Sequence, residues 1–197
     1  FGGSQGLISV TDGQISIGEF VPRIGLSEDE AVESVDEEDE ALFGNHSNLY
    51  NSGNTYSPDW PSNSQRVAAL WKSQYGQDVD GVIGIDPVFL QYLLGLVGNV
   101  SLPDGTVVDG TNAAKVLMHD VYWNYPVEES DGIFASVASA AFDKVLGGIG
   151  DVDVTKLVSA VERGAEEGRL IAWMRNDDEQ NAIKELSLIH ISEPTRR

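Results

Sequence analysis

The chain alternates short apolar runs with longer stretches in which apolar residues recur every three or four positions, a pattern typical of strands and helices in turn. Residues 7–10 and 15–20 are two such runs around Asp12-Gly13, a pair that favours the positive φ angles of a tight hairpin turn. Further strands are predicted over residues 82–85, 100–102, 106–108 and 169–173. The first of these, 82–85, is apolar throughout and bounded by turn residues, which suits a buried strand.

Capping residues mark where the helical stretches begin. Ser62 and Gln65 match a capping box after Pro61, and Asp86-Pro87 matches an N-cap followed by proline in the first turn. We expect helices over residues 62–75, 87–97, 130–146 and 154–167, another from Thr111 or Asn112 to Tyr122, and a last one from Asp177 or Asp178 to Leu186. Strands that alternate with helices, interrupted by hairpins, predict a mixed α/β fold in which helices pack on a mixed sheet.

The length and continuity of this pattern predict one domain over residues 1–186. Residue 1 is Phe rather than Met, and a strand is already under way, so we expect an N-terminally truncated chain. Residues 27–40 hold nine acids and no base, which favours a solvated acidic excursion because like charges repel at helical spacing. Residues 187–197 resemble a translated sequencing adapter, and we set them aside as an artefactual tail.

Charge and composition narrow the class of protein. The chain has 12 Lys and Arg against 32 Asp and Glu, a net charge of −20, which disfavours nucleic acid and a bare anionic membrane as partners. A hydrophobic content of 41% is enough for a packed core. The absence of cysteine excludes disulfides, thiolate zinc sites and cysteine nucleophiles.

The acids and histidines form no complete metal or catalytic motif, so we expect no metal site and no cofactor. Asp80-Gly81 indicates a turn, and Asp153 indicates a helix cap. His119 and Asp120 are adjacent on a predicted helix, where neighbouring side chains point to different faces. We therefore expect His119 to be a surface residue.

A loop over residues 45–57, rich in Asn, Ser, Gly and Tyr, carries the most suggestive side chains. Its Tyr50 and Tyr56, together with Trp60 and the later Trp123 and Tyr125, are aromatic groups of the kind that stack on sugar rings. For Trp60 the alternative is packing over the edge of the domain. The sequence leaves both interpretations open.

Four stretches taken together resemble one bacterial family. They cover residues 10–20, 56–61, 77–87 and 167–173. In combination they are similar to the domain of unknown function 4012, which is common in actinobacteria. The resemblance implies a protein anchored in the membrane, whose domain lies outside the cytoplasmic membrane and whose activity is not established. We expect contact with the membrane only through an N-terminal anchor outside this chain.

A more distant similarity involves Val21-Pro22-Arg23 and residues 76–80, which resemble the LytR-CpsA-Psr family and imply a sandwich of that type. That family transfers lipid-linked glycans to the cell wall. The similarity implies that Arg23, Arg66 and Asp80, with Asp59 as a looser match, hold a pyrophosphate and a magnesium ion. Arginine suits this role because its planar fork binds phosphate in a bidentate manner. The chain departs from the family at Ile24-Gly25, where the family has Asp-Thr.

Two functions from different classes remain. The favoured hypothesis is a non-enzymatic cell-envelope module that binds a glycan or a partner protein, or has an architectural role. The alternative is transfer of lipid-linked glycan phosphate, which requires Arg23 and Arg66 to converge with a carboxylate in one cleft, and which alone would need magnesium. The candidate residues for phosphate or glycan binding are Arg23, Asp59, Trp60, Arg66 and Asp80.

Overall fold

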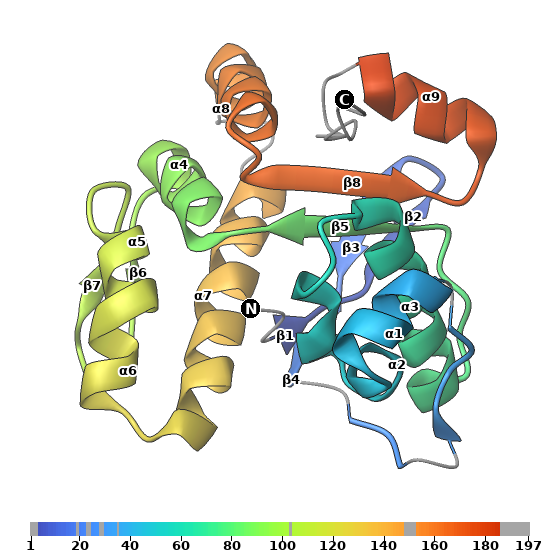
Figure 1. The fold of residues 1–197 in the computed structure, drawn as a ribbon. Coiled ribbons are helices and arrows are strands. Elements are labelled where there is room, and N and C mark those ends of the chain that lie inside the picture. The colour runs from blue at the N-terminus through green and yellow to red at the C-terminus, as the bar shows by residue number, and fades with distance from the viewer. Residues whose placement is uncertain are drawn as a thin grey trace, which may run out of the picture. The chain divides into compact units, whose positions relative to one another are not determined.

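Helices and short antiparallel strand pairs make up the computed structural model, which confirms the predicted mixed α/β class (Figure 1). It describes residues 4–18, 20–22, 25–27, 30–34, 36–102, 104–147 and 153–185. In chain order the elements are β1 (Ser4–Gln5), β2 (Ile8–Thr11), β3 (Gln14–Ile17), β4 (Val21–Pro22), α1 (Glu37–Phe43), α2 (His46–Leu49), η2 (Asn51–Thr55), α3 (Trp60–Tyr75), β5 (Gly81–Ile85), α4 (Pro87–Val97), β6 (Val100–Ser101), β7 (Val107–Val108), α5 (Ala113–Lys115), η3 (Val116–Asp120), α6 (Val121–Asn124), α7 (Val127–Gly147), α8 (Val154–Glu166), β8 (Leu170–Met174) and α9 (Asp177–Glu185). Within these described ranges, no helix combines the length and the apolar character that crossing a membrane requires.

The chain divides into two compact units, which are treated separately below. Unit 1 comprises Phe1–Gly3, Arg23–Gly84 and Ile171–Arg197, and unit 2 comprises Ser4–Pro22 and Ile85–Leu170. The prediction of one domain over residues 1–186 stays a prediction, since a single domain can contain more than one compact unit. The predicted tail, 187–197, lies outside the described residues.

The strands pair two by two, as β1–β4, β2–β3, β5–β8 and β6–β7. The hairpin predicted around Asp12-Gly13 is confirmed, since Val10 pairs with Ile15. The strands predicted over residues 100–102 and 106–108 also form an antiparallel pair, in which Val100 pairs with Val108. Asp12 and Gly13 have φ angles of 51° and 79°, as a two-residue turn of this type requires.

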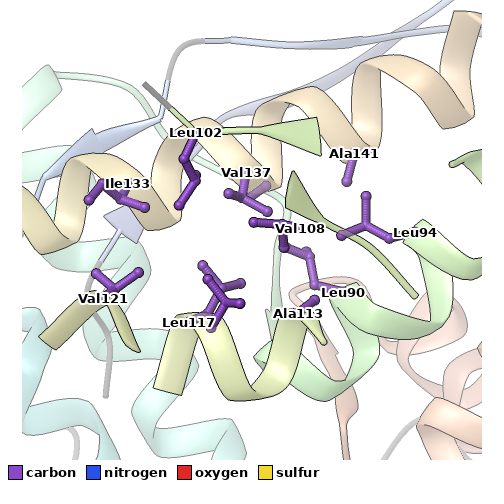
Figure 2. Close-up of a cluster of buried hydrophobic side chains, with 12 residues drawn as sticks. Leu90, Leu94, Leu102, Val108, Ala113, Leu117, Val121, Ile133, Val137 and Ala141 are labelled. Carbon is purple, nitrogen blue, oxygen red and sulfur yellow. The ribbon is translucent and has the colours of Figure 1, made fainter. Parts of the chain in front are cut away.

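The core of unit 2 lies between α4, α7 and the segment that runs from α5 through η3 to α6 (Figure 2). The predicted start of α4 is confirmed, because the Asp86 carboxylate accepts hydrogen bonds from the backbone N–H groups of Val88 and Phe89, both at 2.9 Å. The helix places Leu90 and Leu94 against side chains from β7, α5, η3, α6 and α7. Burial of each such leucine is worth about 2 kcal/mol.

The strand predicted over residues 82–85 is present as β5, but the prediction that it is buried is wrong for Ile83, which is 48% exposed. The other four residues of β5 are half-buried, and Ile85 packs against the core of unit 2. The apolar run suited a strand inside a larger sheet with both faces covered. In the described residues β5 pairs with β8 alone, so its sheet is too narrow to enclose every side chain.

The helix α1 begins inside the stretch 27–40, where the sequence predicts a solvated acidic excursion. The Asp36 carboxylate caps this helix by accepting hydrogen bonds from the backbone N–H groups of Glu38 and Asp39, at 2.9 and 3.2 Å. Four acids then occupy the first turn, where the positive end of the helix dipole favours negative charge. The cap and the dipole offset the repulsion on which the prediction of an excursion rested.

Candidate functional site

Residues 45–57, predicted as a loop, form two short helical turns, α2 and η2, in unit 1. The Ser47 hydroxyl donates a 3.0 Å hydrogen bond to the Gly53 carbonyl, which closes η2 against α2. A Cβ atom at position 53 would lie 2.8 Å from the Ser47 Cα, so the approach requires glycine. The turn is therefore a defined scaffold for the side chains that it carries.

Four rings gather on this scaffold, and we call them the aromatic cluster: Phe43, His46, Tyr50 and Tyr56. The His46 and Tyr56 rings are stacked, with centroids 5.5 Å apart and planes 19° from parallel. Phe43 lies 5.8 Å from Tyr56, and Tyr50 lies 4.7 Å from His46. Tyr56 is 46% exposed and Phe43 is 39% exposed, so the cluster presents ring surface to solvent.

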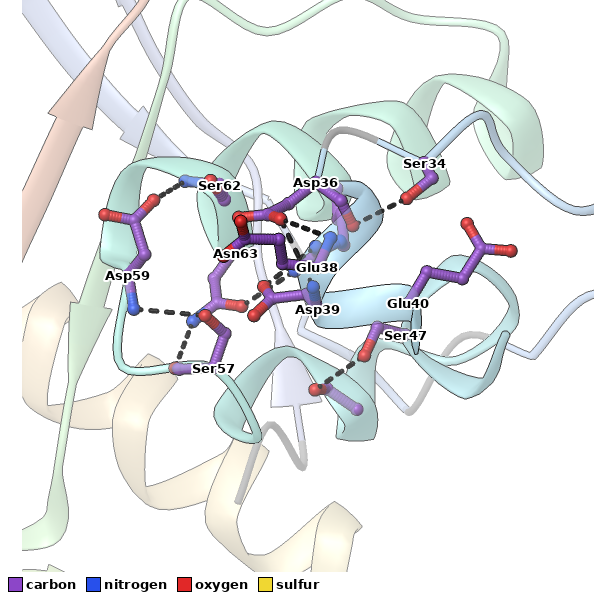
Figure 3. A network of polar contacts seen from close by, with 12 residues as sticks. Ser34, Asp36, Glu38, Asp39, Glu40, Ser47, Ser57, Asp59, Ser62 and Asn63 are labelled. Carbon is purple, nitrogen blue, oxygen red and sulfur yellow. Dashed lines mark hydrogen bonds and ion pairs between the residues drawn. The ribbon is translucent and has the colours of Figure 1, made fainter. Parts of the chain in front are cut away.

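A network of polar contacts holds the scaffold to the N-terminal end of α3 (Figure 3). The Asn63 side chain donates a 2.8 Å hydrogen bond to the Ser57 carbonyl, directly after Tyr56 in the chain. The Ser57 hydroxyl accepts a 3.2 Å hydrogen bond from the Asp59 backbone N–H. Position 56 is thus fixed by the residues that follow it.

Arg66, on the next turn of α3, joins this network to α1. Its side chain is only 2% exposed, and its Nη2 lies 2.9 Å from the Asp39 carboxylate. Its Nη1 donates a 3.2 Å hydrogen bond to the Asn63 side-chain carbonyl, while its Nε has no hydrogen-bond partner among the described residues. The guanidinium therefore holds α1 and the aromatic cluster together, and it does not face solvent.

The other candidate residues have structural roles. Asp59, rather than Ser62, is the N-cap of α3: its carboxylate accepts a 2.9 Å hydrogen bond from the Ser62 N–H. The capping box predicted at Ser62 is therefore wrong, because Pro61 is tolerated inside the first helical turn and the helix begins earlier. Trp60 packs on β5, where a Cβ atom at Gly84 would lie 2.6 Å from its indole ring.

Asp80 lies in a different hollow of unit 1, lined also by Arg175, Asn176 and Glu179. Arg23 lies outside the described residues. Of the five candidates, the structure links only Asp59 and Arg66 in one network, and Trp60 lies between Asp59 and the rest of α3. Among the described residues no group of three metal-ligating side chains is assembled.

The electrostatic surroundings of the aromatic cluster are negative. Glu37, Glu38, Asp39 and Glu40 all lie in the first turn of α1, and Asp36 caps it. Arg66 is engaged with Asp39, so it does not offset the remaining acids at the surface. An anionic ligand would meet repulsion here, whereas a neutral ligand would not.

Sequence reasoning identified Tyr50 and Tyr56 but missed Phe43 and His46. A usable signal was present, because His46 and Tyr50 are four residues apart, the spacing at which side chains meet on a helix. It was overlooked because the stretch was interpreted as a loop.

A family model described as "Protein of unknown function (DUF4012)" matches residues 1–122, which include the whole aromatic cluster. No curated protein matches the chain, and no solved structure matches it.

Proposed function

The chain belongs to the DUF4012 family, and from that premise we propose that it is a non-enzymatic module of the cell envelope, located outside the membrane, that binds a glycan at its aromatic cluster. The extracytoplasmic location and a membrane anchor outside this chain are supported by the resemblance of four sequence stretches to the membrane-anchored proteins of that family. The ligand is argued from the cluster itself.

One observation carries the proposal: the exposed Tyr56 ring is stacked on His46, and the next residue in the chain, Ser57, is held by hydrogen bonds from Asn63 and Asp59. The C–H face of a sugar ring is apolar and packs on the face of an aromatic ring, while its hydroxyls need polar partners around the rim. A ring that is already held in place loses little conformational entropy on binding, which favours affinity.

Charge distinguishes the glycan from the alternative ligand. The acids of α1 disfavour a phosphate-bearing ligand near the cluster, and a neutral sugar avoids that repulsion. Transfer of lipid-linked glycan phosphate would require Arg66 to bind phosphate. Its burial and its pairing with Asp39 support that alternative less well, since the ion pair would have to break first.

The experiment is co-sedimentation of the chain with purified insoluble cell-wall glycan. Tyr56→Ala should weaken binding about 10-fold, equivalent to roughly 1.4 kcal/mol. Tyr75→Ala is the matched control, because Tyr75 belongs to the same unit and is 44% exposed. Equal binding by wild type and Tyr56→Ala, with circular dichroism showing both folded, would refute glycan binding at this cluster.

A further inference from the structure

A second group of exposed aromatic and apolar side chains lies on η3 and α6 in unit 2. We call it the Trp123 surface, and it consists of Met118, His119, Tyr122 and Trp123. Trp123 is 83% exposed, Met118 60% and Tyr122 49%. Exposure of so large an apolar side chain is unusual for tryptophan, which is highly buried on average.

The fold holds this surface in place from behind. Val116, Leu117 and Val121 on the same segment are buried in the core of unit 2. Exposed and buried positions therefore alternate along one anchored helix, and Trp123 is not part of a loose end. Figure 2 shows Leu117 and Val121 pointing into the core between the helices.

The five residues of η3, Val116–Asp120, form a π-helical turn. A π-helix is closed by i→i+5 hydrogen bonds, and such turns occur frequently at functional sites. Here the turn brings the Lys115 ammonium to 2.7 and 2.5 Å from the two carboxylate oxygens of Asp120, five residues later. No pattern in the sequence predicts this turn.

His119 and Asp120, adjacent residues that were predicted to point to different faces, are in contact at this turn. The His119 Nδ1 lies 2.8 Å from an Asp120 carboxylate oxygen. The prediction that His119 is on the surface is confirmed, since its side chain is 70% exposed. Its ring lies nearly parallel to that of Trp123, with centroids 6.4 Å apart and planes at 8°.

Polar groups with balanced charge border the rings. Lys115 is paired with Asp120, and hydrogen bonds from Lys115 and then His119 lower the pKa of that carboxyl group. The positive and negative charges at the site therefore offset one another. A neutral ligand with several hydroxyl groups finds donors and acceptors here, and no net charge favours an anion.

The small number of side chains indicates the size of the ligand. A stable protein interface uses about 20–30 residues on each side, far more than these four. One or two sugar rings match the area of a tryptophan and a neighbouring imidazole.

We propose that the Trp123 surface is a second glycan-binding site, so that the chain binds a repeating glycan bivalently. The inference rests on the proposed function for the first site, at Tyr56, but it uses different residues in the other compact unit. Two sites for the same repeating ligand make the second binding event intramolecular. A polymer that occupies both sites then binds roughly 10²–10⁴-fold more tightly than a short fragment does.

The test uses solubilised cell-wall glycan, both as polymer and as a fraction of two to four sugars, titrated into the full chain. Calorimetry should give about two short fragments bound per wild-type chain. Trp123→Ala should bind one fragment, with the affinity of the Tyr56 site unchanged, and should lose roughly 10²-fold or more in affinity for polymer. Val158→Ala, an exposed apolar residue of unit 2, is the control and should behave as wild type.

The outcomes separate the two proposals. One fragment per wild-type chain, lost with Tyr56→Ala and unchanged by Trp123→Ala, would overturn the second site and leave the proposed function standing. One fragment lost with Trp123→Ala and unchanged by Tyr56→Ala would overturn the first site instead. No binding by wild type to either preparation would overturn both.

Discussion

Replacing Arg66 with methionine removes the guanidinium of the buried ion pair and keeps an unbranched side chain in its place. The change leaves the Asp39 carboxylate, itself only 13% exposed, without its charged partner at 2.9 Å. It also leaves the Asn63 carbonyl without the Nη1 donor at 3.2 Å. The variant therefore tests whether this pair holds α1 to α3.

The magnitude follows from burial. Removing one partner of a buried ion pair costs about 3–5 kcal/mol, because the other charge remains desolvated and unpaired. Against this, the methionine variant no longer buries the Nε of Arg66, which has no hydrogen-bond partner among the described residues. Removing this unsatisfied donor recovers about 1 kcal/mol of unfolding free energy. The loss should thus lie near the lower end, about 3 kcal/mol of unfolding free energy in Arg66→Met.

Lys72 and Asp78 supply a matched control within the same unit, since their charged atoms are also 2.9 Å apart. Their side chains are 59% and 62% exposed, so Lys72→Met should cost less than about 1 kcal/mol. Urea unfolding followed by tryptophan fluorescence measures both variants. Equal losses in the two variants would refute the argument from burial, because geometry at the charged atoms is the same.

Three further predictions concern single positions. Gly84→Ala should lower the free energy of unfolding by about 1–3 kcal/mol and shift the fluorescence of Trp60, because the added Cβ lies 2.6 Å from that ring. Gly132→Ala, which has open space around it in α7, should instead raise the free energy of unfolding by up to about 1 kcal/mol. Equal unfolding midpoints for the two variants would contradict this prediction. Asp59→Ala should lower the free energy of unfolding measured in urea by about 1 kcal/mol, and Ser62→Ala should lower it much less. The reverse order would show that Ser62, rather than Asp59, caps the helix. The pKa of Glu167 is lowered by the Tyr92 hydroxyl at 2.6 Å and then by Arg163, so its folded pKa lies below its unfolded value of about 4.3. The contribution of Glu167 is therefore present above that pH and is lost as the pH falls through the folded pKa, so wild type should lose more stability on acidification than Glu167→Gln.

Local signals in the sequence predicted the parts of the fold that local chemistry decides. Asp86 with Pro87 marked the start of α4, and Asp12-Gly13 marked the first turn, because capping and positive φ depend on a few neighbouring residues. The division of the strands into pairs depends on distant partners. For that reason Ile83 was expected in the core and is exposed.

The candidate site was predicted only in part, for a similar reason. Arg66 was expected to bind phosphate, but its partner Asp39 is 27 residues away in a stretch interpreted as solvated. The sequence identified Tyr56 as a candidate for stacking on sugar rings. Its neighbour His46 was missed, because the helical turn that brings the two rings together was interpreted as a loop. The contact between His119 and Asp120 lies at a π-helical turn, and no pattern in the sequence predicts such a turn.

Glycan binding at the ring of Tyr56 is the central claim, and nuclear magnetic resonance of the ring protons measures this binding most directly. On addition of the short cell-wall glycan fraction, the signals of Tyr56 and His46 should shift together and saturate. The signals of Tyr75, which is equally exposed in the same unit, should stay unchanged. Shifts confined to other rings, or none at saturating glycan, would contradict the account.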